Sequence, residues 1–242
     1  FPQEVGDCVS FGSAHAAEFV QIFDIANGKL EEFKKVFPPY VYGTSRIQIG
    51  GGRIWGDGSN GVWAAQAVEK YGVIAMDTQG CPQYSGSLAR SWGRNGPPQS
   101  MLEQGKLHLV KQTARITTWE EALNALMNGW PIIISSDVGY DYNPRSDGFM
   151  HYSTHWGHCM CLCGADEGDG QVPAHGCILN SWPKGTFGQI KDFRTGETWP
   201  DNTIRARPQD IEAALSQGDS YAFSGLEGFN ARTIDESFFN VM

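Results

Sequence analysis

Three side chains of the kinds that together perform nucleophilic catalysis lie far apart in this sequence. Cys8 stands at the start of a helical pattern, His158 begins an apolar strand pattern, and Asn180 ends the next strand pattern. A thiol becomes a good nucleophile when it ionises, which a helix N-terminus and a nearby imidazole both favour. A side-chain amide behind the imidazole would hold the ring in one orientation. The sequence therefore predicts a catalytic site made of these three residues.

One further residue and two alternatives bear on this prediction. Gln3 lies five residues before Cys8, where its amide could join the backbone N–H of Cys8 in holding an oxyanion. His155 is an alternative to His158, because both lie in "THWGHC", and His158 is favoured because the alternating strand pattern begins directly after it. A lone buried cysteine is usually structural. The ordered Gln, His and Asn companions favour a site over that interpretation.

The first half of the chain must supply the helix that carries Cys8. Its predicted elements are a helix over 10–26, a helix over 30–36, a glycine-rich loop over 50–61 followed by a helix over 62–72, and an irregular surface segment over 79–113. The first helix places Cys8 at its N-terminal turn. The second is expected to end at Pro38 and Pro39, since the residue before a proline is restricted.

The sequence of the second half predicts mostly strands. Thr118 with Glu121 forms a capping box that predicts a helix start. The other predicted elements are strands over 132–135, 157–164 and 176–180, a short helix in "RPQDIEAALSQG" and a last strand beginning at Ser220. Helices followed by strands predict an α+β fold in which a helical lobe packs on an antiparallel sheet lobe. We expect one domain over 1–242, with lobes of roughly 1–115 and 116–242.

Composition narrows the classes of partner and cofactor. The chain of 242 residues has a formal net charge of -9 and no basic block, which argues against nucleic acid as a partner. No stretch approaches the roughly 20 apolar residues of a membrane span. Cys159, Cys161 and Cys163 alternate as on a strand and are expected to be small core residues, with a disulfide framework as the alternative. No CxxC pair occurs, and we expect no metal and no organic cofactor.

The segments "QEVGDCVSFG", "GHCMCLCGA" and "LNSWPKGTFG" together resemble the papain-like cysteine peptidases. The resemblance implies a two-lobe papain-like fold and gives each predicted site residue a role. Cys8 would be the nucleophile, His158 the general base and acid, and Asn180 the residue that orients the imidazole. Gln3 would be the oxyanion donor, and Trp182 would shield the hydrogen bond between His158 and Asn180 from water.

The same resemblance implies a substrate and a reaction. The stretch "GDGSNGVW" is similar to the family's substrate-binding loop, so Gly58 and Gly61 are expected to line the groove for a peptide. The implied function is a thiol endopeptidase that cleaves peptide or protein substrates through an acyl-enzyme. One alternative is a structural or binding component of a larger assembly, such as a virion, with little or no proteolysis. Another is acyl transfer to an amine, as in transglutaminase-like folds.

Overall fold

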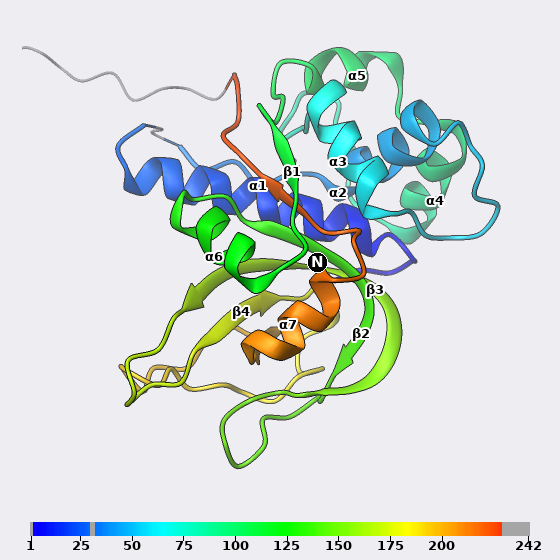
Figure 1. Ribbon diagram of the computed structural model, residues 1–242. Coiled ribbons are helices and arrows are strands. Elements are labelled where there is room, and N and C mark those ends of the chain that lie inside the picture. Colours follow the sequence, from blue (N-terminus) through cyan, green and yellow to red (C-terminus); the bar gives the residue numbers. More distant parts are fainter. Residues whose placement is uncertain (1, 30–31, 229–242) are drawn as a thin grey trace, which may run out of the picture.

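The computed structural model describes residues 2–29 and 32–228 (Figure 1). Within these residues the helices are α1 (Cys8–Ala26), α2 (Pro38–Gly43), the π-helix η1 (Thr44–Ile49), α3 (Gly61–Lys70), α4 (Gly86–Asn95), α5 (Gln99–Gly105), α6 (Trp119–Met127) and α7 (Pro208–Leu215). The strands are β1 (Thr113–Arg115), β2 (Ile132–Tyr140), β3 (Tyr152–Asp166), β4 (His175–Leu179), β5 (Thr203–Ala206) and β6 (Tyr221–Phe223). Helices α1 to α5 gather on one side of the sheet in Figure 1.

The strands form a single antiparallel sheet in the order β1-β6-β2-β3-β4-β5. Strands β2 and β3 are its long central pair, and Ser136 lies opposite His158 in their register. A register shift between Ser136 and Val138 follows directly, and such irregularities often lie next to functional sites because they redirect side chains. The α+β class with an antiparallel sheet is confirmed.

Both faces of this sheet are buried, and alternation along the strands divides the core in two. Ile133, Cys159, Cys161 and Phe223 belong to the core on the side of the helical layer, whereas Ile132, Ile134, Met160 and Leu162 belong to the core under α6 and α7. Successive side chains of a strand point to opposite faces, so the apolar run "PIIIS" contributes to both cores. The alternating cysteines on β3 therefore lie under the helices.

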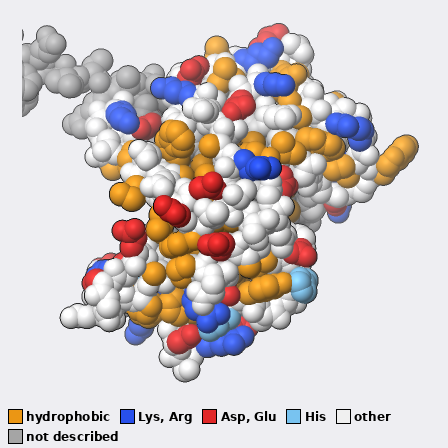
Figure 2. Space-filling view, viewed as in Figure 1, with side chains coloured by type: hydrophobic (Ala, Val, Ile, Leu, Met, Phe, Trp, Pro, Cys, Tyr) orange, Lys and Arg blue, Asp and Glu red, His pale blue; other side chains and the backbone are white. Residues whose placement is uncertain are grey.

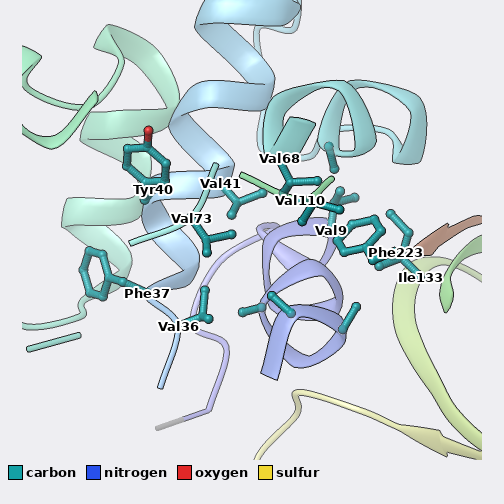
Figure 3. Packing of buried hydrophobic residues seen from close by; sticks show 14 of the residues in the cluster. Val9, Val36, Phe37, Tyr40, Val41, Val68, Val73, Val110, Ile133 and Phe223 are labelled. Carbon is teal, nitrogen blue, oxygen red and sulfur yellow. The ribbon is translucent and has the colours of Figure 1, made fainter. Parts of the chain in front are cut away.

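Helix α1 is the element that joins the helical layer to the sheet. It packs on β3 and also contacts α2 and α3 (Figure 1). Figure 3 shows Val9 of α1 beside Phe223 and Ile133 of the sheet. A Cβ at Gly12 would lie 2.9 Å from the Sγ atom of Cys159, so a glycine at this position permits the close approach of helix and strand. The predicted helix over 10–26 is confirmed, with Cys8 in its first turn.

Two predictions for the first half are wrong. Residues 32–35 are not helical. Pro38 and Pro39 begin α2 instead of ending a helix. Proline fits the first turn of a helix because the backbone N–H groups of that turn have no carbonyl partner within the helix, so the missing N–H of proline loses no hydrogen bond. Residues 30 and 31 of that predicted helix lie outside the described residues. The segment over 79–113 contains α4 and α5. These helices are short and glycine-containing, and α4 is fixed by packing, with Trp92 against Phe37 at a centroid separation of 5.7 Å.

The second half follows the predicted order more closely. The capping box is present, with the Thr118 side chain accepting from the Glu121 N–H, and the helix α6 begins there. The predicted strands correspond to β2, β3, β4 and β6, and the short helix corresponds to α7. Strand β5 is absent from the predictions. It pairs with β4 and is fully buried, and its four residues are too few to show a period.

Candidate active site

A cleft of about 500 Å³ lies where the N-terminus of α1 faces the central strands. It is lined by Gly6, Cys8, Val9, Asp57, Gly58, Ser59, Ser135, Ser136, Gly157, His158, Gln217 and Asp219. The cleft thus brings together Cys8 and His158, which are 150 residues apart in the chain. The helical layer supplies one wall, and the paired strands β2 and β3 supply the other.

His158 and Asn180 form a buried pair at this cleft. Nε2 of His158 lies 2.7 Å from Oδ1 of Asn180. The same Oδ1 atom accepts a hydrogen bond of 2.7 Å from the Ser181 N–H. A backbone N–H can only donate, so this atom is the amide oxygen and Nε2 must carry the proton that it shares with Asn180. The basic nitrogen of the imidazole is consequently Nδ1.

Aromatic side chains cover this pair. The Trp182 ring stacks on the His158 ring with centroids 4.7 Å apart, and Trp156 meets Trp182 edge-on at 4.7 Å. The Phe187 ring stacks on the rings of Trp182 and Tyr142. Trp156 was not among the predicted site residues. Trp156 could have been predicted from its position two residues before His158, since strand residues at that spacing share a face of the sheet.

Gln3 lies beside Ser181 and is not among the residues that line the cleft. Its amide nitrogen donates to the Val5 carbonyl at 2.6 Å, and its amide oxygen accepts from the Ser181 hydroxyl at 2.8 Å. The Gln3 backbone N–H also donates to the Ser181 carbonyl at 2.9 Å. Gln3 therefore ties the segment before Cys8 to the segment after Asn180. The Gln3 side-chain nitrogen carries two N–H donors, and the bond to Val5 uses one of them.

The glycine-rich loop forms one rim of the cleft and is held from beneath by Arg46. This side chain is only 4% exposed and lies in the π-helix η1. Its guanidinium donates to the carbonyl oxygens of Gly93 at 2.7 Å and Ile54 at 2.8 Å, and also to that of Gly58. π-helical turns are frequent at functional sites. The Arg46 contacts fix the loop from 54 to 58 in one conformation.

The two glycines predicted to bind substrate have different positions. Gly58 lines the cleft and has a φ of 109°, a conformation that suits glycine. Its N–H donates to the Tyr42 hydroxyl at 2.9 Å, so this N–H is already engaged. Gly61 is buried and does not line the cleft. It starts α3, and its N–H donates to the Asp219 carboxylate at 2.6 Å.

Burial controls the protonation of the two reacting groups. It raises the pKa of the Cys8 thiol to about 11, although the N–H groups of Cys8 and Val9 act in the opposite direction. Burial also lowers the pKa of His158 to about 4, against the hydrogen bond to Asn180. Both shifts disfavour the charged forms. The helix N-terminus alone does not make a thiolate here, so at neutral pH the proton stays on the sulfur and the imidazole is neutral.

Asp7 is a buried acid next to Cys8 and was not among the predicted site residues. It is fully buried, and its Oδ1 atom has no hydrogen-bond partner among the described residues. Its Oδ2 atom accepts from the Tyr84 hydroxyl at 3.3 Å. Burial is the main cause that raises the pKa of Asp7 to about 7, while Asp57 and Glu4 add to the effect. An ionised Asp7 in turn disfavours the Cys8 thiolate.

This burial predicts a pH-dependent effect of Asp7→Asn on stability. The folded-state pKa of about 7 lies above the ordinary value of 3.8, so the wild-type protein loses stability as pH rises from about 4 to about 7. The variant should be more stable by about 4 kcal/mol in free energy of unfolding at pH 8, and near pH 4 the two proteins should be equal. Urea denaturation at several pH values measures this, and a difference that stays constant with pH would contradict it.

Other kinds of site receive no support in the part of the chain that the structure describes. No group of three or more His, Cys, Asp or Glu side chains there could hold a metal ion. None of the described helices is long and apolar enough to cross a membrane. All six cysteines are free thiols, so the alternative of a disulfide framework is not seen. Cys163 and Cys177 are neighbours, with their sulfurs 4.0 Å apart on β3 and β4.

Comparison with solved structures defines the class of fold. Xylellain, a cysteine protease from Xylella fastidiosa, is similar over 91% of this chain and 80% of its own, with 16% identity and a TM-score of 0.62. Digestive procathepsin L 3 of the Tenebrio molitor larval midgut is similar over 91% of this chain, with 14% identity and a TM-score of 0.56. This chain spans 64% of that second protein. No protein-family model and no curated protein sequence matches. The papain-like fold predicted from the Cys, His and Asn motifs is confirmed.

Proposed function

We propose that this protein is a cysteine peptidase that hydrolyses peptide bonds through an acyl-enzyme on Cys8. The observation that carries the proposal is the shared cleft of Cys8 and His158, with Asn180 bonded behind the imidazole. A nucleophile, a base and a residue that orients the base are the parts that acyl transfer requires. The papain-like fold supports the proposal, because xylellain, one of the similar structures, is a cysteine protease by its name.

In the first step the Cys8 sulfur attacks the carbonyl carbon of the scissile bond. The thiol proton passes to Nδ1 of His158, because the neutral imidazole is the resting form. The carbonyl oxygen becomes an oxyanion near the first turn of α1, where the Cys8 N–H faces it as donor. To act as a second donor, Gln3 would have to turn its remaining side-chain N–H toward the cleft, which it does not line in this structure.

The intermediate then collapses in two stages. The C–N bond breaks, His158 gives its proton to the leaving amine, and the acyl group remains on sulfur as a thioester. Water then attacks the thioester carbon while His158 takes one of its protons, and the proton returns to the sulfur as the acid is released. Asn180 keeps Nε2–H occupied throughout, so Nδ1 serves in both stages. Trp182 covers the His158 ring and limits the access of water to it.

Alkylation of the six cysteines with iodoacetamide tests the proposal. Cys81 is a matched reference inside the same chain, because burial also raises its pKa to about 11 and it is also half-buried. The similarly raised pKa values mean that neither thiol is ionised at neutral pH, so the part of the Cys8 rate that is lost in His158→Ala reports proton removal by His158. We expect Cys8 to react at least ten-fold faster than Cys81 near pH 7, as measured by peptide mass spectrometry.

The His158→Ala variant is the control for this experiment. It should bring the rate at Cys8 down to the rate at Cys81, since the base is gone and the burial of the thiol remains. Equal reactivity of Cys8 and Cys81 in the wild-type protein would contradict the proposal. That outcome would favour the alternative of a structural or binding component with a papain-like fold.

A further inference from the structure

The cleft around Cys8 is lined by small and polar groups. Apart from Cys8 and His158, the side chains that line it are those of Val9, Asp57, Ser59, Ser135, Ser136, Gln217 and Asp219. Only Val9 among them is apolar, and no Lys or Arg lines the cleft in the part of the chain that the structure describes. A cleft of about 500 Å³ with such walls has room for a long side chain. It offers that side chain few apolar contacts.

Asp219 is a carboxylate of the cleft whose described hydrogen-bond partners are backbone N–H groups. Its two carboxylate oxygens accept from the N–H groups of Gly61 and Val62, at 2.6 and 2.8 Å, at the start of α3. These bonds fix the carboxylate in place and use two of its roughly four acceptor positions. No Lys or Arg forms an ion pair with Asp219 among residues 2–29 and 32–228. Asp219 is half-buried, and this burial raises its pKa. A bound cation would therefore offset the desolvation of the Asp219 carboxylate.

Asp57 is the second acidic side chain that lines the cleft, and it differs from Asp219 in having an arginine partner. Arg90 binds it through Nε and Nη2, each at 3.1 Å, so its charge is already largely offset. The net charge of the whole chain is -9, and several Asp and Glu side chains lie near the middle of the face shown in Figure 2. Acidic segments of a substrate would be repelled by this field, and basic segments would be attracted.

We propose that the cleft selects peptides with a Lys or Arg side chain next to the scissile bond, and that Asp219 binds the cationic end of that side chain. The inference rests on the proposed peptidase function and adds the class of substrate to it. The polar walls formed by Ser135 and Ser136 leave room for the extended side chain. Asp219 then gains the positive partner that the described part of the chain does not supply.

Hydrolysis of three sets of matched peptides tests this assignment. Fluorogenic peptides carry Lys, norleucine or Glu at each of the two positions before the scissile bond, and norleucine keeps the alkyl chain without the charge. We expect kcat/KM to be roughly ten-fold or more higher for Lys than for norleucine at the favoured position, and lowest for Glu. Asp219→Asn keeps an oxygen for the α3 N–H groups and should bring the Lys and norleucine values together. Asp77→Asn removes an equal charge outside the cleft and should leave the ratio unchanged.

Two measurements keep the test decisive if a variant misfolds or turnover is absent. In the wild-type protein the Lys preference should shrink as salt rises from about 0.05 to about 0.5 M, because ions screen the attraction. In Cys8→Ala protein, calorimetric titration should show tighter binding of the Lys peptide than of the norleucine peptide. Absence of hydrolysis in every set would overturn the peptidase proposal alone. Equal binding of the Lys and norleucine peptides would overturn the substrate class, and a preference that survives Asp219→Asn would overturn the role of Asp219.

Discussion

Replacing Cys8 by alanine should abolish peptide hydrolysis, lowering kcat by roughly 10⁴-fold or more. The reason is that every later step of the proposed reaction takes place on a thioester, which cannot form without the sulfur. The Cβ of alanine keeps the backbone of the first turn of α1 and its N–H donors in place, so binding of substrate should persist. Steady-state hydrolysis of a fluorogenic peptide measures the loss, and mass spectrometry verifies that the variant protein is intact.

Cys81→Ala is the matched control for this variant. Cys81 is half-buried like Cys8 and has a similarly raised pKa, yet it does not line the cleft. Its replacement should leave hydrolysis near the wild-type value. If Cys8→Ala retains more than a small fraction of wild-type turnover in a preparation free of other peptidases, Cys8 is not the nucleophile.

Removal of His158 should have the second-largest effect. His158→Ala should lower kcat by roughly 10²- to 10⁴-fold, because burial keeps the Cys8 thiol protonated and no other described side chain of the cleft is an imidazole. His155 provides the control, since it is exposed on the same strand and bonds the Tyr152 hydroxyl at 3.1 Å. His155→Ala should keep most of the activity. The reverse result would transfer the role of the base to His155.

Asn180 should act through the imidazole, and the pH profile distinguishes this role from a purely structural one. Asn180→Ala should lower kcat less than His158→Ala, since nucleophile and base remain while the ring loses its fixed orientation. Asn180→Asp places a carboxylate on Nε2–H, which stabilises the imidazolium and raises the pKa of His158. The wild-type protein should stay active down to about pH 4 to 5, near the pKa of about 4 for His158. The acid limb of kcat/KM should move to higher pH in Asn180→Asp, and an unmoved limb would exclude this positioning role.

In the proposed reaction, the Cys8 thiol and the His158 imidazole are both neutral before the substrate reacts. Burial disfavours the charged forms of both Cys8 and His158. A charged pair would require stabilisation that the two desolvated groups do not receive from the surrounding residues. The proton is therefore expected to move only as the sulfur approaches the carbonyl carbon. Asp7 reinforces this state above its pKa of about 7, because its negative charge disfavours the thiolate.

Local patterns in the sequence were sufficient where an element is stabilised by neighbours in the chain. The capping box of Thr118 and Glu121 is made of residues three apart, and the structure forms it as predicted. The long apolar helix α1 and the central strands were visible for the same reason. Helices α4 and α5 were missed because their stability comes from contacts with α2 and the loops around them, such as the packing of Trp92 on Phe37. No short-range pattern reports such contacts.

The motifs around Cys8, His158 and Asn180 predicted the papain-like fold, which is confirmed, and the chemistry that is proposed here. Only the tertiary structure decided what surrounds these groups. It brought Asp219 to the start of α3 and Asp57 to the cleft, placed Arg46 beneath the loop from 54 to 58, and engaged Gln3 with Ser181. It also made burial outweigh the helix N-terminus at Cys8. Desolvation and charge depend on every group within a few ångströms, and most of those groups come from distant parts of the chain.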